Sequence, residues 1–475
     1  MSAQCPDLAA APATATTATA APAARAGLLP LVALAIGFVM AMLDVTVVNV
    51  GLSSIRQSLS TPLTMLVWIV DGYTLTFAAM LLVGGALADR YGAKNMYLLG
   101  LLVFVAASLL CGAAPNGPML VGARLLQGLG AAFFMPSSLS LLSHIYEDDR
   151  VRARMLGIWA ATVSSAAVLG PLVGGVLIHT FGWRSVFLIN VPVGLLGLAM
   201  ANKLIPAVQK HERALTILSH VLGVAVLATL SFVLIQGPVY GWTSRPIVAA
   251  ALATVLAAFL LIRRERRGAV PLLPRELFAT PQFAAANGVG FLINFGVYGQ
   301  LFFVSLFLQG ARGADALQTG LQLLPMMAVF FVGNLLSGRI TAQRGPRFPM
   351  LLGLAIGMLF SGLLTALTPD TPYWLFALIA ALANFGASIA VPAMTTAVMQ
   401  VAGRQHGNSA AAALNANRQI GALVGVAVMG AILHTFAGWN MRTPLAFGFT
   451  CMMYAVALLL VARYIAAAPR DTTQN

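Results

Sequence analysis

The most constraining feature of this chain is a long apolar run that ends abruptly in a charged turn. Residues 64–87 are predominantly apolar and contain one acid, Asp71. As a helix rising 1.5 Å per residue, this run crosses a hydrocarbon core of about 30 Å. A glycine-bounded charged turn follows at residues 85–94, and a new apolar run begins at Met96. Because lipid offers no partner for free backbone groups, the pattern predicts two membrane-spanning helices joined by a tight hairpin.

The composition extends this prediction to the whole chain. Of the 475 residues, 59% are hydrophobic and only 8% are charged, whereas soluble domains carry roughly 25% charged residues. We therefore predict an all-α polytopic membrane protein. Hydropathy predicts 14 spans, at 28–51, 64–87, 96–114, 118–142, 155–179, 184–204, 215–236, 246–263, 283–309, 318–338, 348–368, 373–399, 411–435 and 443–464.

The basic residues predict the orientation of these spans. With the N-terminus inside, the outer loops hold only Arg56, Arg184, Arg245, Arg312 and Arg442, whereas 20 of the 27 lysines and arginines are cytoplasmic. Cytoplasmic loops are enriched in Lys and Arg, so both termini are predicted to be cytoplasmic. The same bias, with contacts to the lipid bilayer, explains the net charge of +14 without a nucleic-acid partner.

Three short segments recur in the same order at nearly one offset, which predicts two homologous six-span halves related as parallel repeats. Residues 85–94, 130–136 and 170–174 are repeated at 338–347, 386–392 and 421–425.

The repeat divides the chain into five regions. They are a disordered cytoplasmic tail (1–27), an N-terminal six-helix bundle (28–205), a linker with two inserted transmembrane helices and a basic cytoplasmic segment (206–282), a C-terminal six-helix bundle (283–465), and a cytoplasmic tail (466–475).

Three charged side chains are predicted to lie at one depth, about 10 Å below the outer surface. Asp44 precedes the outer end of its span by seven residues, Asp71 follows the outer start of the next by seven, and Arg124 is six residues into the fourth. Two carboxylates and a guanidinium at one level predict a proton-coupling site, because burial and a nearby cation change proton affinity in opposite directions. A static ion pair between Arg124 and one aspartate is the alternative.

Glycine and proline mark the fifth span. Gly170, Pro171, Gly174 and Gly175 form a small-residue face that permits close helix contact and bending. Close packing alone is the alternative, but it does not explain a mid-span proline, which costs a backbone hydrogen bond.

Polar side chains recur within the spans of the second half. Such groups must find partners or water, so they are expected either to line a cavity or to hydrogen-bond between helices. Asn294 and Tyr298 share a helical face, and Arg418 is near enough to the inner end to snorkel instead. The candidate substrate-cavity residues are Asn49, Tyr73, Gln127, Asn294, Tyr298, Asn384, Asn415 and Arg418.

Several motifs of other function classes are missing. The sequence contains no Walker A loop, no HExxH metal motif and no nucleophile elbow. Residues 124–130 superficially match a dinucleotide fingerprint, but no strand precedes them and the third glycine is lacking. We predict no enzymatic activity, no catalytic or metal-binding residues and no cofactor.

Five segments resemble motifs of the major facilitator superfamily, specifically its fourteen-span drug:proton antiporter branch. They are LDVTVVNV at 43–50, GALADRYGAK at 85–94, RLLQGLG at 124–130, GPLVGG at 170–175 and FLINVPVG at 187–194. The segments WIVDGY at 68–73, FMPSSLS at 134–140 and LNANRQIG at 414–421 look most like the methylenomycin-resistance exporters.

The resemblance implies two six-helix bundles that rock about a central cavity, with Arg124 in proton transfer. It also implies a cytoplasmic latch at Asp89 and Arg90. The latch motif contains Gly85, Asp89, Arg90, Gly92 and Lys94. The second-half copy has Ala342 in place of the acid, so only the first latch is expected to be strong. The span-one motif also departs from its common Ala-Leu-Pro continuation at residues 51–53.

Together these features predict a proton-coupled antiporter. It would export a small antibiotic or drug across the bacterial cytoplasmic (inner) membrane by alternating access, as a monomer powered by the proton gradient, and would confer resistance. A proton-coupled symporter that imports a small metabolite is the first alternative, and a membrane sensor or scaffold is the second. Two acids balance two arginines within the spans, so the sequence predicts no bias in substrate charge.

Overall fold

The computed structural model describes residues 28–146, 148–206, 216–268 and 275–466. In these residues helices are the only regular secondary structure. Fourteen of them are long and apolar enough to cross a membrane, which confirms the predicted all-α polytopic fold. The two predicted tails, apart from residue 466, lie outside the described residues, as does part of the basic linker segment.

Three of the predicted spans differ in detail from simple, separate helices. The sixth span, Ser185–Leu204, is divided at Ile189 into two helices. One continuous element holds two spans, Tyr373–Gly403 and Ser409–Thr435, because Gly403 adopts a φ of 62° and reverses the chain between them. The helices are α1 Leu28–Val50, α2 Leu52–Leu59, α3 Leu63–Tyr91, α4 Ala93–Ala113, α5 Gly117–Ile145, α6 Asp149–Phe181, α7 Ser185–Leu188, α8 Asn190–Leu204, α9 Ile217–Tyr240, α10 Arg245–Arg267, α11 Arg275–Ala279, α12 Pro281–Gly310, α13 Ala316–Arg344, α14 Arg347–Leu364, α15 Tyr373–Thr435 and α16 Trp439–Tyr464.

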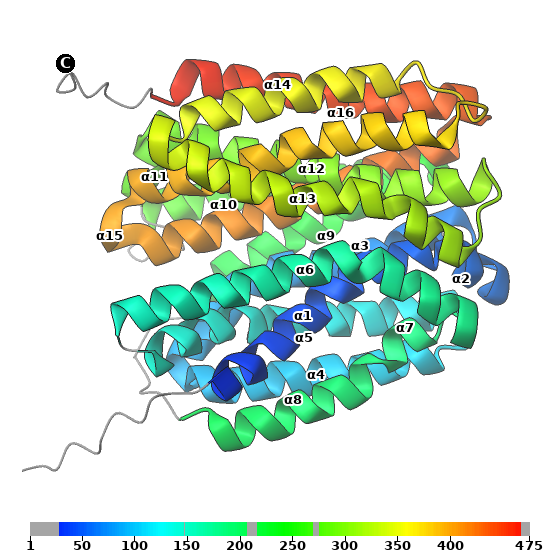
Figure 1. Ribbon diagram of the computed structural model, residues 1–475. Helices are drawn as coiled ribbons and strands as arrows, with labels where there is room; N and C mark the ends of the chain where they lie inside the picture. The colour runs from blue at the N-terminus through cyan, green and yellow to red at the C-terminus, as the bar shows by residue number, and fades with distance from the viewer. Residues whose placement is uncertain (1–27, 147, 207–215, 269–274, 467–475) are drawn as a thin grey trace, which may run out of the picture.

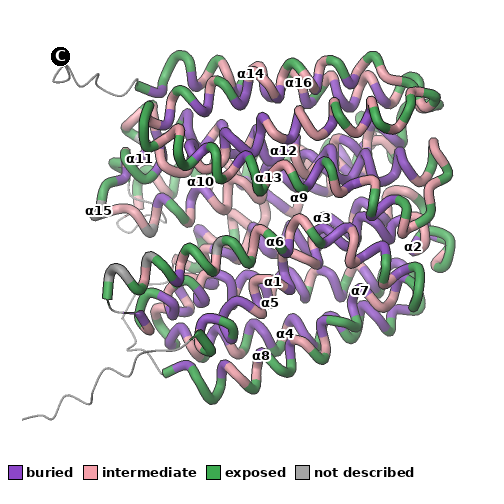
Figure 2. The backbone as a smooth tube through the Cα atoms, in the orientation of Figure 1, coloured by how far each residue is buried: buried purple, intermediate pink, exposed green. Residues whose placement is uncertain are grey.

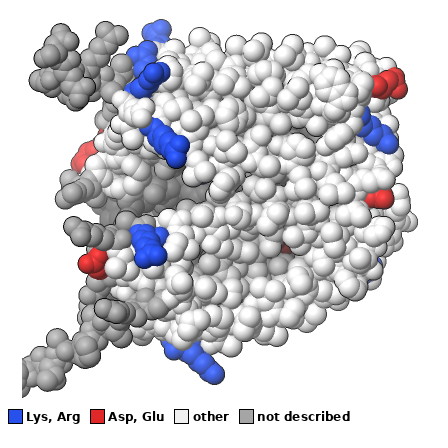
Figure 3. Space-filling view, viewed as in Figure 1, with Lys and Arg blue, Asp and Glu red and all other residues white. Residues whose placement is uncertain are grey.

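The long helices lie side by side and alternate in direction, so the molecule has two ends (Figure 1). The terminal end is where α1 begins and α16 finishes, and the α2 end is opposite. The surface between them carries a broad band with almost no charged residues, and most of the visible Lys and Arg gather at the terminal end (Figure 3). Buried residues concentrate where the helices face one another (Figure 2). An uncharged belt between two polar ends is the surface that a bilayer requires.

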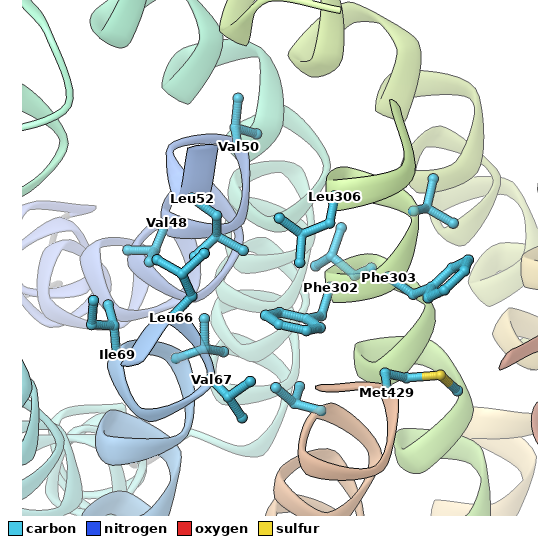
Figure 4. Packing of buried hydrophobic residues seen from close by; sticks show 14 of the residues in the cluster. Val48, Val50, Leu52, Leu66, Val67, Ile69, Phe302, Phe303, Leu306 and Met429 are labelled. Atoms are coloured by element: carbon cyan, nitrogen blue, oxygen red, sulfur yellow. The ribbon is translucent and has the colours of Figure 1, made fainter. Parts of the chain in front are cut away.

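The helices form two groups, α1–α8 and α12–α16, that meet along two seams. Helix α6 packs on α13, and α3 packs on α15. Near the α2 end a hydrophobic cluster crosses between the groups, with Val67 of α3 facing Phe302 of α12 and Met429 of α15 (Figure 4). The groups therefore share an apolar core at this end.

Glycines set equivalent close crossings in both halves. A Cβ added to Gly130 of α5 would lie 2.7 Å from backbone atoms of Gly100 and Phe104 of α4. Gly353 of α14 and Gly386 of α15 make the corresponding contact in the second half. Backbones can approach this closely only where the side chain is a hydrogen. The repeat seen in the sequence is thus also a repeat of helix packing.

The inserted pair, α9 and α10, is asymmetrically placed. Helix α9 packs against both α3 and α15, with Leu227 in a cluster with Leu75 and Leu423. Helix α10 packs on α9, where Thr254 donates to Thr229 at 2.8 Å. The side of α10 that carries Leu252, Val255, Leu256 and Phe259 is exposed, as expected for a lipid-facing surface. One inserted helix therefore covers the seam between the halves.

Replacing Gly130 by alanine is expected to destabilise the protein, because the added methyl group would push α4 and α5 apart. Overpacking of this kind costs about 1–3 kcal/mol. Gly122 on the same helix has no atom within 4 Å of an added Cβ, so Gly122→Ala should leave stability unchanged or slightly raised. The measurement is the melting temperature in detergent. Equal melting temperatures for the two variants would contradict the close crossing.

Candidate functional site

A buried ion pair between α1 and α5 forms the centre of the first half. Nη1 of Arg124 donates to Oδ2 of Asp44, and both side chains are almost completely inaccessible. Nε of Arg124 donates to the carbonyl oxygen of Ile69 on α3 at 2.9 Å. A buried charge is tolerated when it is paired and hydrogen-bonded, and Arg124 meets both conditions.

Gln127 extends this pair into a network. Its Oε1 accepts from Nη1 of Arg124 at 2.7 Å, and its Nε2 donates to Oδ1 of Asp44 at 3.1 Å. The same Nε2 donates to Oγ of Ser108 on α4 at 2.8 Å. Gln127 is one helical turn from Arg124, so α5 presents both side chains to Asp44 together. The predicted cavity residue Gln127 therefore acts as a partner of the ion pair.

Aromatic rings enclose the guanidinium of Arg124. Its Cζ lies 4.6 Å from the ring centre of Tyr73 and 5.9 Å from that of Phe187. Rings at these distances attract a cation through their quadrupoles and exclude water from its faces. The ion pair is therefore held in an apolar, water-poor site.

Asp71 lies apart from this network, in contrast to the expected group of three charges at one level. Its carboxylate is fully buried, and neither oxygen has a hydrogen-bond partner. One turn away on each side, Val67 packs against Gly430 of α15, and Leu75 clusters with Leu423 of α15. Residues at i−4 and i+4 share a helical face, so Asp71 lies on the face of α3 that meets α15. Asp71 and Arg124 lie at similar depth but do not meet, because the side chain of Asp71 projects from a different face of α3.

Tyrosines connect the first half to a cation in the second. Tyr73, which stacks on Arg124, lies near Tyr298 of α12, and Tyr298 lies near Arg418 of α15. Arg418 is half-buried, and its Nε is buried without a partner. Four of the predicted site residues therefore follow one another from the first half to the second: Arg124, Tyr73, Tyr298 and Arg418.

The glycines of α6 bring it against two helices at once. Gly170 contacts Thr46 of α1, and Gly174 contacts Val47 of the same helix. On the opposite half, Gly175 meets the backbone of Ala316 in α13, and Gly320 of α13 meets Pro171. A larger side chain at these places would separate the helices. The motif therefore lies in the α6–α13 seam.

The predicted latch residues lie at the terminal end. Gly92 ends α3 with a φ of 95°, in the region that favours glycine, and Gly85 is open to added atoms. Nζ of Lys94 donates to the carbonyl of Asn202 in the last turn of α8 at 2.9 Å. Arg90 stacks on Tyr91, and Asp89 is half-buried.

The second half reproduces part of this latch. Gly345 ends α13 with a φ of 71°, and Arg347 donates to the carbonyl of Ala462 in the last turn of α16 at 2.9 Å. Ala342, which replaces the acid of the first copy, is exposed.

The remaining polar candidates are dispersed. Nδ2 of Asn49 donates to the carbonyl of Val45 in its own helix, while the backbone carbonyl of Asn49 accepts from Oγ of Ser305 of α12 at 2.6 Å. Asn294 bonds only within α12. Asn384 is fully buried and donates to Gln300 of α12 at 3.1 Å, which fits a helix-joining role. Asn415 is half-buried on α15.

Two pockets occur at the α2 end, and none of the predicted cavity residues lines either of them. The larger, of about 780 Å³, lies between α2 and the α12–α13 connection. The smaller, of about 380 Å³, is lined by Ser53, Arg56, Pro62, Leu63, Leu306, Gly310, Leu433, His434, Trp439 and Arg442. The described residues contain no group of three His, Cys, Asp or Glu that could hold a metal ion.

Sequence reasoning missed four participants in the ion-pair site: Ser108, Phe187, the carbonyl of Ile69, and Cys111, whose Sγ donates to Oε1 of Gln127 at 3.6 Å. Ser108 is a polar residue within an apolar span, a signal like the one that identified the asparagines. Phe187 and Ile69 carry no such signal, because apolar side chains and backbone carbonyls are present throughout the spans.

Two repeated six-span halves, with charged groups buried within and between them, are the architecture of a secondary transporter. The chain belongs to the Major Facilitator Superfamily, whose family model matches residues 34–426. It is therefore a many-span membrane transporter.

Several relatives are similar over nearly the whole chain. The methylenomycin A resistance protein of Bacillus subtilis (strain 168) is 50% identical over 442 residues, covering 93% of this chain and 95% of that protein. The methylenomycin A resistance protein of Streptomyces coelicolor is 46% identical, covering 92% of each.

Solved structures share the fold at low identity. A point mutant of the nucleoside transporter NupG has a TM-score of 0.65 at 11% identity, covering 92% of this chain and 100% of that chain. The xylose transporter XylE from E. coli, in a partially occluded inward open conformation, has a TM-score of 0.63 at 13% identity, covering 93% of this chain and 98% of that one.

Breaking the Asp44–Arg124 pair is expected to cost stability. Asp44→Asn leaves the buried guanidinium uncompensated, and losing one partner of such a pair costs about 3–5 kcal/mol. The double variant Asp44→Asn/Arg124→Gln should lose less than the sum of the single variants, because no buried charge remains. The exposed acid Asp370 supplies the control Asp370→Asn. Melting temperatures in detergent test the cycle, and strictly additive losses would show that the two residues are not coupled.

Proposed function

We propose that this transporter exports a small antibiotic or drug in exchange for protons, by alternating access, and confers resistance on a bacterial cell. It would work as a monomer, without a cofactor. Support comes from the relatives named for methylenomycin A resistance and from the multidrug resistance protein Stp of Mycobacterium tuberculosis, which is 33% identical over 421 residues. The observation that carries the coupling to protons is the partnerless carboxyl group of Asp71 in the α3–α15 seam.

Asp71 supplies the coupling because its two protonation states favour different arrangements of the seam. A neutral carboxyl can remain packed between Val67 and Leu75 against α15. An ionised carboxylate without a partner is costly there and needs water or a cation. Loss of the proton therefore favours separation of α3 from α15, and binding of a proton favours their closure.

Asp44 and Arg124 supply a second, reciprocal step. Arg124 is paired to ionised Asp44 and stacks on Tyr73. A proton that reached Asp44 would remove the charge that holds the guanidinium, and Arg124 would then need another anion or water. Because Tyr73 lies near Tyr298 in the second half, a movement of Arg124 would also change the contacts between the two halves.

The contacts between the halves support an alternating-access cycle. At the α2 end, Ser305 donates to Asn49, and Gln309 accepts from the backbone of Ser53 at 3.2 Å. These bonds, together with the shared apolar core, hold that end closed. Opening of the α2 end would break these two hydrogen bonds and separate the glycine contact between α6 and α13. All three contacts lie at that end.

The proton gradient supplies sufficient energy. One charge that moves through 100 mV releases about 2.3 kcal/mol, which corresponds to roughly a 50-fold gradient of a neutral drug per proton. No hydrolysis of a nucleotide is needed.

The terminal end is proposed to face the cytoplasm. Lys94, Arg266, Arg344 and Arg463 lie at or just beyond helix ends there, whereas the α2 end has far fewer cations among the described residues. This distribution supports insertion with both termini inside.

Asp71→Asn is expected to abolish transport driven by a pH gradient, because the amide keeps the seam in the state that the neutral carboxyl favours. In proteoliposomes, uptake of methylenomycin A against an imposed gradient should fall at least about 10-fold, and Asp71→Glu should retain part of it. Asp315→Asn, which changes an acid at the α2 end outside the seam, is the matched control. Wild-type exchange by Asp71→Asn would refute proton coupling at this residue.

Labelling will test the proposed orientation. In a variant with Cys5, Cys111 and Cys451 replaced by alanine, a cysteine at exposed Gln57 of α2 should react with a membrane-impermeant maleimide in intact cells. A cysteine at exposed Gln343, near the end of α13, should react only after permeabilisation. The reverse pattern would place the terminal end outside.

A further inference from the structure

We propose that α10 binds the phosphate of an anionic phospholipid at the terminal end of the molecule. The binding residues are Arg263, Arg266 and Arg267, which we call the α10 arginine cluster. Phosphatidylglycerol is a lipid of this kind. The site belongs to the inserted helix pair and is independent of the proposed export function and of its substrate.

The exposed side of α10 is apolar over the middle of the helix and becomes basic at its end. The apolar stripe consists of Leu252, Val255, Leu256 and Phe259, all of which are more than half exposed. The α10 arginine cluster follows Phe259 by four, seven and eight residues, and its members are also exposed. Residues at these spacings share one face of an α-helix. The three guanidinium groups therefore continue the lipid-facing stripe to the terminal end.

The two acids near the cluster have partners on other helices. Glu265 and Glu276 are the only acids between residues 245 and 282. Glu265 accepts from Oγ of Ser219 on α9 at 2.8 Å, and Glu276 contacts His406 of α15 at 2.9 Å. Within the described residues no carboxylate forms an ion pair with the cluster. The positive charge of this face is therefore not balanced by its own segment.

The fourth arginine of the run points to another side of α10. Nε of Arg264 donates to Oγ of Ser219 at 3.0 Å, so this side chain is directed to α9 together with Glu265. Thr254, eleven residues before Glu265, also bonds to α9, which agrees with the helical period. Position around the helix thus separates the α9-facing Arg264 and Glu265 from the lipid-facing cluster.

Contacts from α11 stabilise the end of α10 that carries the cluster. Nε of Arg275 donates to the backbone carbonyl of Glu265 at 2.9 Å, and Nη2 of Arg275 donates to that of Gly268. Carbonyls in the last turn of a helix lack partners within the helix, and Arg275 supplies one here. The cluster is therefore presented on an ordered helix end.

A phospholipid suits this face in both its charge and its shape. Guanidinium groups bind phosphate oxygens through paired hydrogen bonds. The acyl chains of the same molecule can cover the exposed apolar stripe, whereas a free phosphate would gain only the headgroup contact. Each basic residue at an anionic membrane surface strengthens the attraction by about fivefold, so three arginines discriminate strongly against a zwitterionic lipid.

A lipid bound here would also support the seam between the halves. Helix α10 packs on α9, and Leu227 of α9 packs against Leu75 of α3 and Leu423 of α15. A phospholipid held by α10 would therefore keep the inserted pair against this seam from its outer side.

Native mass spectrometry of the purified full-length protein tests the proposal, with phosphatidylglycerol, zwitterionic phosphatidylcholine and glycerol 3-phosphate as the probes. The wild type should bind the first phosphatidylglycerol about 100-fold more tightly than phosphatidylcholine, as expected for three arginines. The variant Arg263→Gln/Arg266→Gln/Arg267→Gln should lose at least about 10-fold of this preference. Replacement of the same three residues by lysine should retain most of it.

The matched control is Arg154→Gln/Lys203→Gln/Arg463→Gln. It removes three exposed cations at the same end of the molecule, but from three different helices, and should bind phosphatidylglycerol like wild type. Equal losses in this control and in the cluster variant would show that only the overall charge matters. Equal binding of the two lipids by wild type would refute the site, and binding of glycerol 3-phosphate as tight as that of phosphatidylglycerol would refute a lipid as its ligand.

Size-exclusion profiles and melting temperatures in phosphatidylcholine nanodiscs verify that the cluster variant is folded. If it is not, the three single glutamine variants supply the test, each with an expected loss of about fivefold in affinity for phosphatidylglycerol. Unchanged affinity in all three would overturn the proposal.

Discussion

The free-energy cost of a charge in an apolar bundle governs this protein. Lipid and packed side chains cannot solvate an ion, so each charged group within the spans must find a partner, water or a ligand. Asp44 and Arg124 satisfy one another and are further fixed by Gln127. Asp71 has no partner, and Arg418 has no acid. The two sets of charges therefore differ. The Asp44–Arg124 pair is satisfied within one half, whereas Asp71 and Arg418 carry buried polar atoms without a hydrogen-bond partner among the described residues.

The two halves share a backbone design but differ in chemistry. Glycine crossings between α4 and α5 recur between α14 and α15, and the contact of Lys94 with α8 recurs in that of Arg347 with α16. These features determine how closely helices approach, and both halves need the same packing to fold. Polar groups have diverged instead, since the first half holds both deep acids and the second half holds only a deep cation.

The inserted helices pack at the interface between α3 and α15. Helix α9 contacts α3 and α15 and covers the side of the seam in which Asp71 lies, while α10 separates α9 from lipid on one side. The covering helix keeps lipid away from the side of the seam in which the buried carboxyl group of Asp71 lies. Because Leu227 packs on Leu75 and Leu423 together, any parting of α3 from α15 must also move or slide past α9.

The class of fold, the number of spans, the repeat and the superfamily could all be predicted from the sequence, because hydropathy, loop charge and short motifs are local properties of the chain. The charged residues of the site were also identifiable there, since an ion in an apolar run is conspicuous wherever it points. Three-dimensional packing was needed to show which aspartate pairs with Arg124, that Gln127, Ser108 and Phe187 join that pair, and that Asn384 bonds within its own half. The depth of a residue along a helix follows from counting residues. Which neighbour its side chain meets depends on how the helix is rotated about its axis, and only the packing of the helices fixes that rotation. Asp44 and Asp71 lie at similar depth, yet α3 turns Asp71 toward α15, and that rotation is set by the packing of glycines and apolar side chains far away in the sequence.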